Sequence, residues 1–203
     1  MVRRLLQLYV GLGLYGLSTA MFIRADLGVD PWDVFHLGVA LQTGMTIGTV
    51  IIVTGAAVLL LWIPLRQMPG LGTLSNVICI GLAADASMAL IPELSSLPFR
   101  IALLVSGIVA NAIATGMYIG AGFGSGPRDG LMTGIHARLG WSIRSVRTSI
   151  EVSVLIIGCL LGGSFGVGTV IYALTIGPLI QLCLPWFRQK PRIETVPQPE
   201  RVV

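Results

Sequence analysis

Long apolar stretches dominate the chain, and short segments rich in glycine, proline or charge separate them. A helix needs about 20 apolar residues to cross the ~30 Å hydrocarbon layer of a membrane. Six stretches reach or approach that length, near residues 5–23, 47–65, 71–91, 101–121, 148–163 and 168–187. The pattern therefore predicts an all-α membrane protein with six transmembrane helices.

Two further predicted helices are too short to span a membrane. They cover about residues 32–42 and 128–139, and a helix of this length reaches only ~18 Å. Each follows an irregular segment with glycine and proline, at residues 24–33 and 120–129. Irregular backbone is tolerated at membrane depth only where protein or water covers it. We therefore expect two short broken or re-entrant helices.

The chain also repeats itself at a fixed offset of 96 residues. Aligning residues 5–92 with 101–188 without a gap gives 21 identities in 88 positions, seven of them glycine. The composition alone would give roughly seven identities. The repeat divides the chain into residues 1–98 and 99–188, followed by a polar tail at 189–203 whose composition predicts disorder.

The number of spans decides how the two halves are oriented. Three spans per half is an odd number, so the second half is predicted to be inverted relative to the first. Most basic residues then fall on the cytoplasmic side together with both termini, and only Arg24 and Arg100 lie outside. The alternative, in which the short helices also span, gives a parallel repeat and fits the basic residues less well.

A Gly-x-x-Pro-x-Asp motif occurs once in each half. Its residues are Gly28, Pro31 and Asp33 in the first half and Gly124, Pro127 and Asp129 in the second. Proline is well suited to the first turn of a helix, and an aspartate there lies beside the exposed N–H groups. The two aspartates either cap their helices or attract a cation or proton at the mouth of a path.

A Gly-x-Gly-Thr motif also occurs in both halves. Its residues are Gly70, Gly72 and Thr73 in the first half and Gly166, Gly168 and Thr169 in the second. Glycine allows tight turns and close helix approach, and threonine can cap a helix. A phosphate site is weakly supported because no lysine or arginine follows closely in either copy. We interpret these turns as packing elements.

Three of the candidate residues, Asp85, Arg128 and Glu151, have no ionisable partner at the matching position of the other half. Arg128 stands where the first half has Trp32, and Asp85 lies within an apparent span. Glu151 lies one helical turn after Arg147, which predicts a local ion pair. Acidic residues inside a membrane are costly and are functional candidates by default. The candidate path residues are therefore Asp33, Asp85, Arg128, Asp129 and Glu151, with Asp85 as the first to test.

The remaining chemistry is sparse. The chain is 54% apolar and only 11% charged, with a mean hydropathy of +0.87, so its net charge of +4 does not indicate nucleic-acid binding. His36 and His136 do not occupy matching positions, and the three cysteines stand singly. We predict no metal site, no cofactor and no enzymatic activity.

The residues that follow Ala25, together with the Gly-Leu-Gly-Thr turn and Gly126-Pro-Arg-Asp-Gly-Leu-Met132, resemble the YczE/YitT-type bacterial integral membrane proteins. The likeness covers residues 3–187 and is closest to the YczE branch. It implies a multi-pass protein of the bacterial inner membrane and supplies no substrate.

Broken segments at matching positions of two repeats are typical of transporters. We therefore predict a transporter or permease for a small solute or ion, with the path between the repeats. The alternative is a non-transporting membrane scaffold or regulatory partner. The predicted partners are the lipid bilayer, a small solute or ion, and a second copy or another membrane protein.

Overall fold

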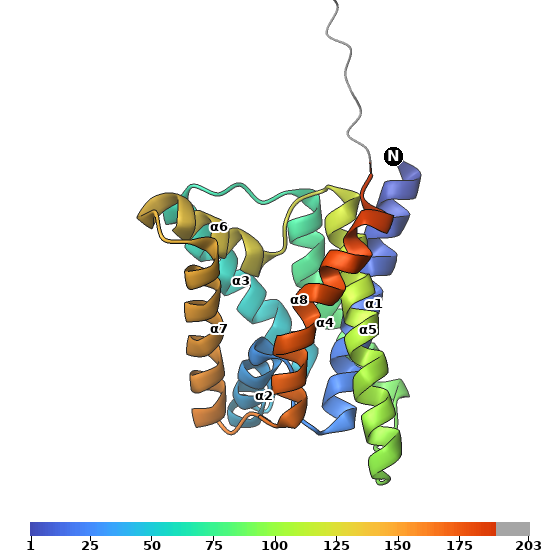
Figure 1. The fold of residues 1–203 in the computed structure, drawn as a ribbon. Coiled ribbons are helices and arrows are strands. Elements are labelled where there is room, and N and C mark those ends of the chain that lie inside the picture. The colour runs from blue at the N-terminus through green and yellow to red at the C-terminus, as the bar shows by residue number, and fades with distance from the viewer. Residues whose placement is uncertain (190–203) are drawn as a thin grey trace, which may run out of the picture.

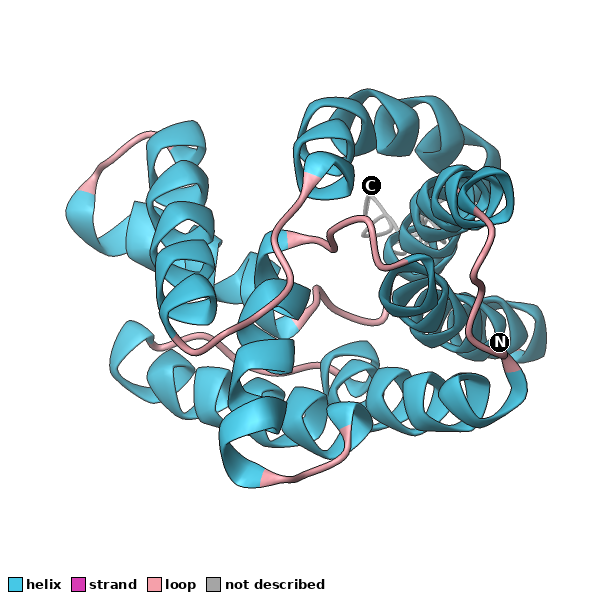
Figure 2. Cartoon of the chain, turned by 90° about the horizontal axis from the view of Figure 1, so that it is seen from below, coloured by secondary structure: helices cyan, strands magenta, loops and turns pink. Residues whose placement is uncertain are grey.

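The computed structural model describes residues 1–189, which form eight helices and no strand (Figures 1 and 2). The helices are α1 (Val2–Ala25), α2 (Pro31–Thr43), α3 (Ile47–Leu65), α4 (Leu71–Leu90), α5 (Leu97–Ala121), α6 (Pro127–Leu139), α7 (Ile143–Leu160) and α8 (Val167–Phe187). The all-α prediction is confirmed. The predicted tail lies outside the described residues except for Gln189.

Five helices are long and apolar enough to cross a membrane: α1, α3, α4, α5 and α8. The sixth predicted span, near 148–163, falls largely in α7, which is not among the five. Its sequence explains the difference, since Arg144, Arg147 and Glu151 lie in its N-terminal half. The chain is therefore an α-helical protein with several apolar helices of membrane-spanning length.

The helices run back and forth between two ends of the molecule (Figure 1). α1, α4 and α7 run from the upper end of the view to the lower end, and α3, α5 and α8 run in the opposite direction. The short helix α2 lies at the lower end and the short helix α6 at the upper end. The start of α1 and the end of α8 share the upper end.

Local sequence explains why the short helices begin and end where they do. The side chain of Asp30 accepts a hydrogen bond from the Asp33 N–H at 2.9 Å, and Pro31 occupies the first turn of α2. α6 likewise begins at Pro127. Both end at a glycine in the left-handed region, with φ of 72° at Gly44 and 70° at Gly140. Both helices were predicted to within a residue of each end.

The turns and the broken segments bind each other across the two halves. The Gly72 N–H donates to the Phe123 carbonyl at 2.8 Å, and the Gly168 N–H donates to the Leu27 carbonyl at 2.7 Å. The two donors, Gly72 and Gly168, are one repeat apart, and so are the two acceptors, Leu27 and Phe123. Each donor binds the acceptor of the other half. Each Gly-x-Gly-Thr turn thus holds the broken segment of the other half.

Glycine is required where these backbones meet. Gly28 has a φ of +100°, and a Cβ atom built there would lie 2.5 Å from the Gly166 nitrogen. Gly124 has a φ of +119°, and its Cβ would lie 2.8 Å from the Thr73 hydroxyl. An L-residue at either place would be strained and would collide with the facing turn. The motif glycines therefore serve close backbone packing.

A second pair of exchanged contacts uses arginine. The Arg4 Nε donates to the Ala121 carbonyl at 2.9 Å, and the Arg100 Nε donates to the Ala25 carbonyl at 2.7 Å. Each arginine binds the last residue of the long helix that leads into the other half's broken segment. A cationic side chain at a helix C-terminus donates hydrogen bonds to the free carbonyl groups and interacts favourably with the helix dipole.

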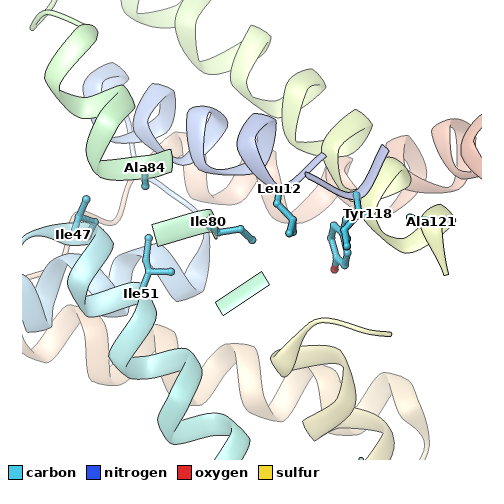
Figure 3. Packing of buried hydrophobic residues seen from close by; sticks show 8 residues of the cluster. Leu12, Ile47, Ile51, Ile80, Ala84, Tyr118 and Ala121 are labelled. Atoms are coloured by element: carbon cyan, nitrogen blue, oxygen red, sulfur yellow. The ribbon is translucent and has the colours of Figure 1, made fainter. Parts of the chain in front are cut away.

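The largest apolar cluster sits where α1, α3, α4 and α5 meet (Figure 3). Its members are Leu8, Leu12, Ile47, Ile51, Ile80, Ala84, Tyr118 and Ala121. α1 and α5 pack most extensively of all helix pairs, and each short helix packs on the second long helix of the other half, α2 on α7 and α6 on α3. This exchange brings the two broken segments towards the centre of the molecule.

Candidate solute-binding cavity

A cavity of about 220 Å³ lies between the two broken segments. Asp30, Pro31 and Trp32 line it from the first segment and the start of α2. Gly126, Pro127, Arg128 and Asp129 line it from the second segment and the start of α6. α7 contributes Arg147, Ile150 and Glu151, and α8 contributes Tyr172, Ile176 and Ile180. Residues from both halves therefore form one site, in which charged side chains stand in a largely apolar wall.

Arg128 is the central cation of the wall. It lies at the start of α6, and its guanidinium carbon stands 4.7 Å above the ring of Trp32. The nearest carboxylate is that of Asp30, with 3.9 Å between Nη1 and Oδ1. This distance allows a Coulombic attraction and is too long for a hydrogen bond. Trp32 and Arg128, which occupy matching positions of the two repeats, thus pack on each other.

Asp30 and Asp33 form a buried acidic pair under this arginine. Their side chains are only 3% and 2% exposed. One oxygen of Asp33 lies 3.0 Å from Nδ1 of His36, on the same face of α2. The second oxygen of each carboxylate, Oδ2, is buried and has no hydrogen-bond partner within residues 1–189. Asp30, and not Asp33, caps α2.

Asp129 has a different environment from its repeat partner Asp33. Its Oδ2 accepts a hydrogen bond from the Tyr118 hydroxyl at 2.9 Å, and it lines the cavity. Asp33 lies behind Asp30 and is not among the lining residues. The two aspartates of the shared motif therefore take different positions relative to the site.

Arg147 and Glu151 form the predicted ion pair, with 2.8 Å between Nε and Oε1. Both line the cavity, and their side chains are 51% and 36% exposed. The local pairing expected from their spacing is confirmed. It also leaves the pair at the outer rim of the cavity, because these side chains remain partly accessible.

Asp85, the first candidate from the sequence, does not line the cavity. Its carboxylate accepts hydrogen bonds from the Thr46 hydroxyl at 2.6 Å and the Gly48 N–H at 2.7 Å. It therefore caps the start of α3 from the neighbouring helix. The structure thus places Asp85, predicted as the polar group inside the path, at this cap and outside the cavity, an arrangement that its sequence neighbours do not reveal.

Three tyrosines and an asparagine were not among the candidates from the sequence. Tyr15, Tyr118 and Tyr172 line the cavity from three different helices. The Tyr172 hydroxyl donates to Asn111 at 3.0 Å, and the Asn111 amide donates to Ser18 at 2.9 Å. Asp30 was also missed, although an aspartate directly before proline and a predicted helix is a recognisable N-cap signal. The tyrosines had no such signal.

Metal chemistry gains no support from these residues. Within residues 1–189 no group of three or more histidine, cysteine, aspartate or glutamate residues is arranged to hold a metal ion. The cavity instead presents a guanidinium, carboxylates and phenol groups. Such groups bind organic or inorganic solutes through hydrogen bonds and charge.

Several apolar helices of spanning length around a cavity with charged lining residues define an integral membrane protein of the α-helical class. Residues 2–185 match the family of unknown function DUF6198, and the chain belongs to this family.

The chain is similar to three proteins from two bacteria. It is 38% identical to an "Uncharacterized protein" of Haemophilus influenzae over 92% of this chain and 85% of the relative. It is 33% identical to the "Uncharacterized membrane protein YczE" of Bacillus subtilis, over 84% of this chain and 80% of the relative. It is 25% identical to the "Uncharacterized protein YyaS" of the same organism, over 88% and 92%. The predicted resemblance to YczE is confirmed. No solved structure matches the chain.

Proposed function

We propose that this protein is a transporter or permease for a small polar solute or ion, and not an enzyme, and that the path runs through the central cavity. The observation that carries the proposal is the lining of the cavity by both broken segments. Transporter sites typically form where interrupted helices of two repeats meet near the middle of the membrane.

The proposal includes two inverted repeats of three spans each, at residues 1–98 and 99–188, with α7 as the sixth span. The opposite directions of matching helices support this topology (Figure 1). The exchanged contacts one repeat apart also support it. The charges of α7 that count against a span partly turn to the cavity, where Arg147 pairs with Glu151. These two charged side chains therefore need not be exposed to lipid.

The distribution of basic residues supports a bacterial inner-membrane protein with both termini in the cytoplasm. With this orientation α6 lies towards the cytoplasm and α2 towards the outside. Each broken segment then closes one end of the path. Movement of one half against the other would open the cavity to the two sides in turn.

Cysteine accessibility tests this proposal without knowledge of the substrate. Cys79, Cys159 and Cys183 are first replaced by alanine, and Thr115→Cys is introduced, since Thr115 lines the cavity and is 6% exposed. A membrane-impermeant thiol reagent is applied to right-side-out and inside-out vesicles. A transporter is expected to react from both sides.

Two control variants define the sides. Met68→Cys lies in the turn between α3 and α4, and Ser95→Cys lies in the turn between α4 and α5; both positions are exposed. Met68→Cys is expected to react only from the cytoplasmic side and Ser95→Cys only from the outside. The reverse result would overturn the orientation. Labelling of Thr115→Cys from one side alone would overturn transport and favour the non-transporting membrane partner.

A further inference from the structure

The donors of Arg128 are largely unused. A guanidinium carries five N–H donors in a planar fork. Within residues 1–189 Arg128 makes no direct hydrogen bond, and its contacts are the Trp32 ring and the Asp30 carboxylate at 3.9 Å. Its side chain is 31% exposed and lines the cavity. Arg128 therefore has N–H donors available at the cavity, and carboxylates bind guanidinium groups in a bidentate manner.

The carboxylate of Asp30 offers the opposite charge at the same place. Its side chain is 3% exposed and lines the cavity. Oδ1 accepts from the Asp33 N–H, and the buried Oδ2 has no partner within the described part of the chain. A buried acceptor without a partner is costly, and more so when it is charged. Because Asp30 lines the cavity, its carboxylate would attract a cationic N–H group of a ligand bound there.

The charge balance of the wall decides between the ligand classes. The charged lining residues are two arginines, Arg128 and Arg147, and three acids, Asp30, Asp129 and Glu151. A plain anion would add to this negative excess, and a plain cation would leave the Arg128 fork without an acceptor. A ligand with one group of each sign satisfies both Arg128 and Asp30. Arg147 and Glu151 already neutralise each other.

The size of the cavity limits the ligand. Its volume of about 220 Å³ exceeds the ~150 Å³ of an engineered cavity that binds benzene. A small organic molecule therefore fits, and much of the rest of the wall is apolar or aromatic, including Ile176, Ile180 and Met132. These side chains suit a short hydrocarbon part between or beside the charged ends.

We propose that the cavity binds a compact zwitterion of the amino-acid type, with its acidic group on Arg128 and its ammonium group on Asp30. The role of this ligand as a transported substrate rests on the proposed transport function. Binding of the ligand is testable separately, on the purified protein. Trp32 lies against Arg128 and provides a fluorescence signal in the site.

The test is a binding titration of the full chain in detergent, by calorimetry and tryptophan fluorescence. Glycine and β-alanine are the zwitterionic probes, and acetate and methylammonium represent their separate halves. We expect each zwitterion to bind at least tenfold more tightly than either half. Acetate binding as tightly as glycine would overturn the proposal in favour of an anion site, and equal binding of methylammonium would overturn it in favour of a cation site.

Variants identify the two contacts. Arg128→Lys keeps the charge and removes the fork, and Asp30→Asn keeps an N-cap residue while removing the charge. Each is expected to weaken glycine binding at least tenfold. Asp85→Asn, a carboxylate outside the cavity, is expected to leave it unchanged. Unaltered glycine binding in both cavity variants, or no binding of any probe to the parent, would overturn the zwitterion assignment. Two-sided labelling of Thr115→Cys would still uphold transport.

Discussion

The two halves of the molecule have the same backbone contacts and different side-chain chemistry. Gly72 and Gly168 donate to carbonyls one repeat apart, and Arg4 and Arg100 do the same at the ends of α5 and α1. At the cavity the halves diverge, since Asp30 matches Gly126 and Trp32 matches Arg128. Contacts used twice thus build the frame, and residues used once make the site.

The halves also differ in how closely their last two helices pack. α3 and α4 pack against each other, with Val77 on the flank of Gly55. Their counterparts α7 and α8 barely touch, and the cavity reaches between them through Arg147, Glu151 and Tyr172. The aligned position of Gly55 is Glu151. The larger, charged side chain of Glu151 is accommodated because α8 does not pack closely on α7.

The largest effect is expected from a substitution where the broken segment of one half contacts the Gly-x-Gly-Thr turn of the other half. Gly28→Ala forces a Cβ atom into the Gly166 backbone at a φ of +100°, so we expect a loss of about 3 kcal/mol or more in folding stability. Thermal unfolding followed by size-exclusion chromatography measures the loss. Gly13→Ala is the matched control, because nothing lies within 4 Å of its added Cβ. Equal stability of the two variants would contradict the role of this close backbone contact in holding the two halves together.

The next test compares the two motif aspartates. Asp33→Ala removes the partner of buried His36 and is expected to cost about 2–3 kcal/mol. Asp129→Ala removes one hydrogen bond from Tyr118 beside an accessible cavity, and about 1 kcal/mol is expected. Unfolding midpoints of the two variants measured side by side decide this. Equal shifts would mean that the two environments do not differ in energy as described.

A smaller and symmetric effect is expected at the two exchanged arginines. Arg4→Met and Arg100→Met each remove a charged donor from a helix C-terminus, at about 1 kcal/mol per site. The sites lie at opposite ends of α1 and α5, so the double variant is expected to show the sum of the two losses. Midpoints of thermal unfolding for both single variants and the double variant test this. A loss confined to one arginine would break the equivalence of the halves.

The smallest effect is expected at Asp85. Asp85→Asn keeps one acceptor for the Gly48 N–H and replaces the other with an amide group that can donate to the Thr46 hydroxyl, so the cap of α3 weakens by about 0.5 kcal/mol or less. Thermal stability measures the capping term, and glycine titration measures the site. A loss of glycine binding with intact stability would return Asp85 to the path.

Features that depend on residues close together in the sequence could be predicted from the sequence. The short helices at 31–43 and 127–139 follow from Asp-Pro and Gly-Pro starts and glycine ends, all of which act within a few residues. The Arg147–Glu151 pair likewise follows from spacing on one helix. Asp85 shows the opposite case, because its partners Thr46 and Gly48 lie on another helix, more than 35 residues away.

The sequence by itself determined the helical class, the hydropathy suited to a membrane, the repeat and the two breaks. These properties depend on apolar content and on turn chemistry within one segment. The tertiary structure alone decided that Arg128 lies over Trp32, that Asp30 faces the cavity and that the three tyrosines surround it. The physical reason is the exchange of contacts between the halves, which brings together side chains from positions about one repeat apart.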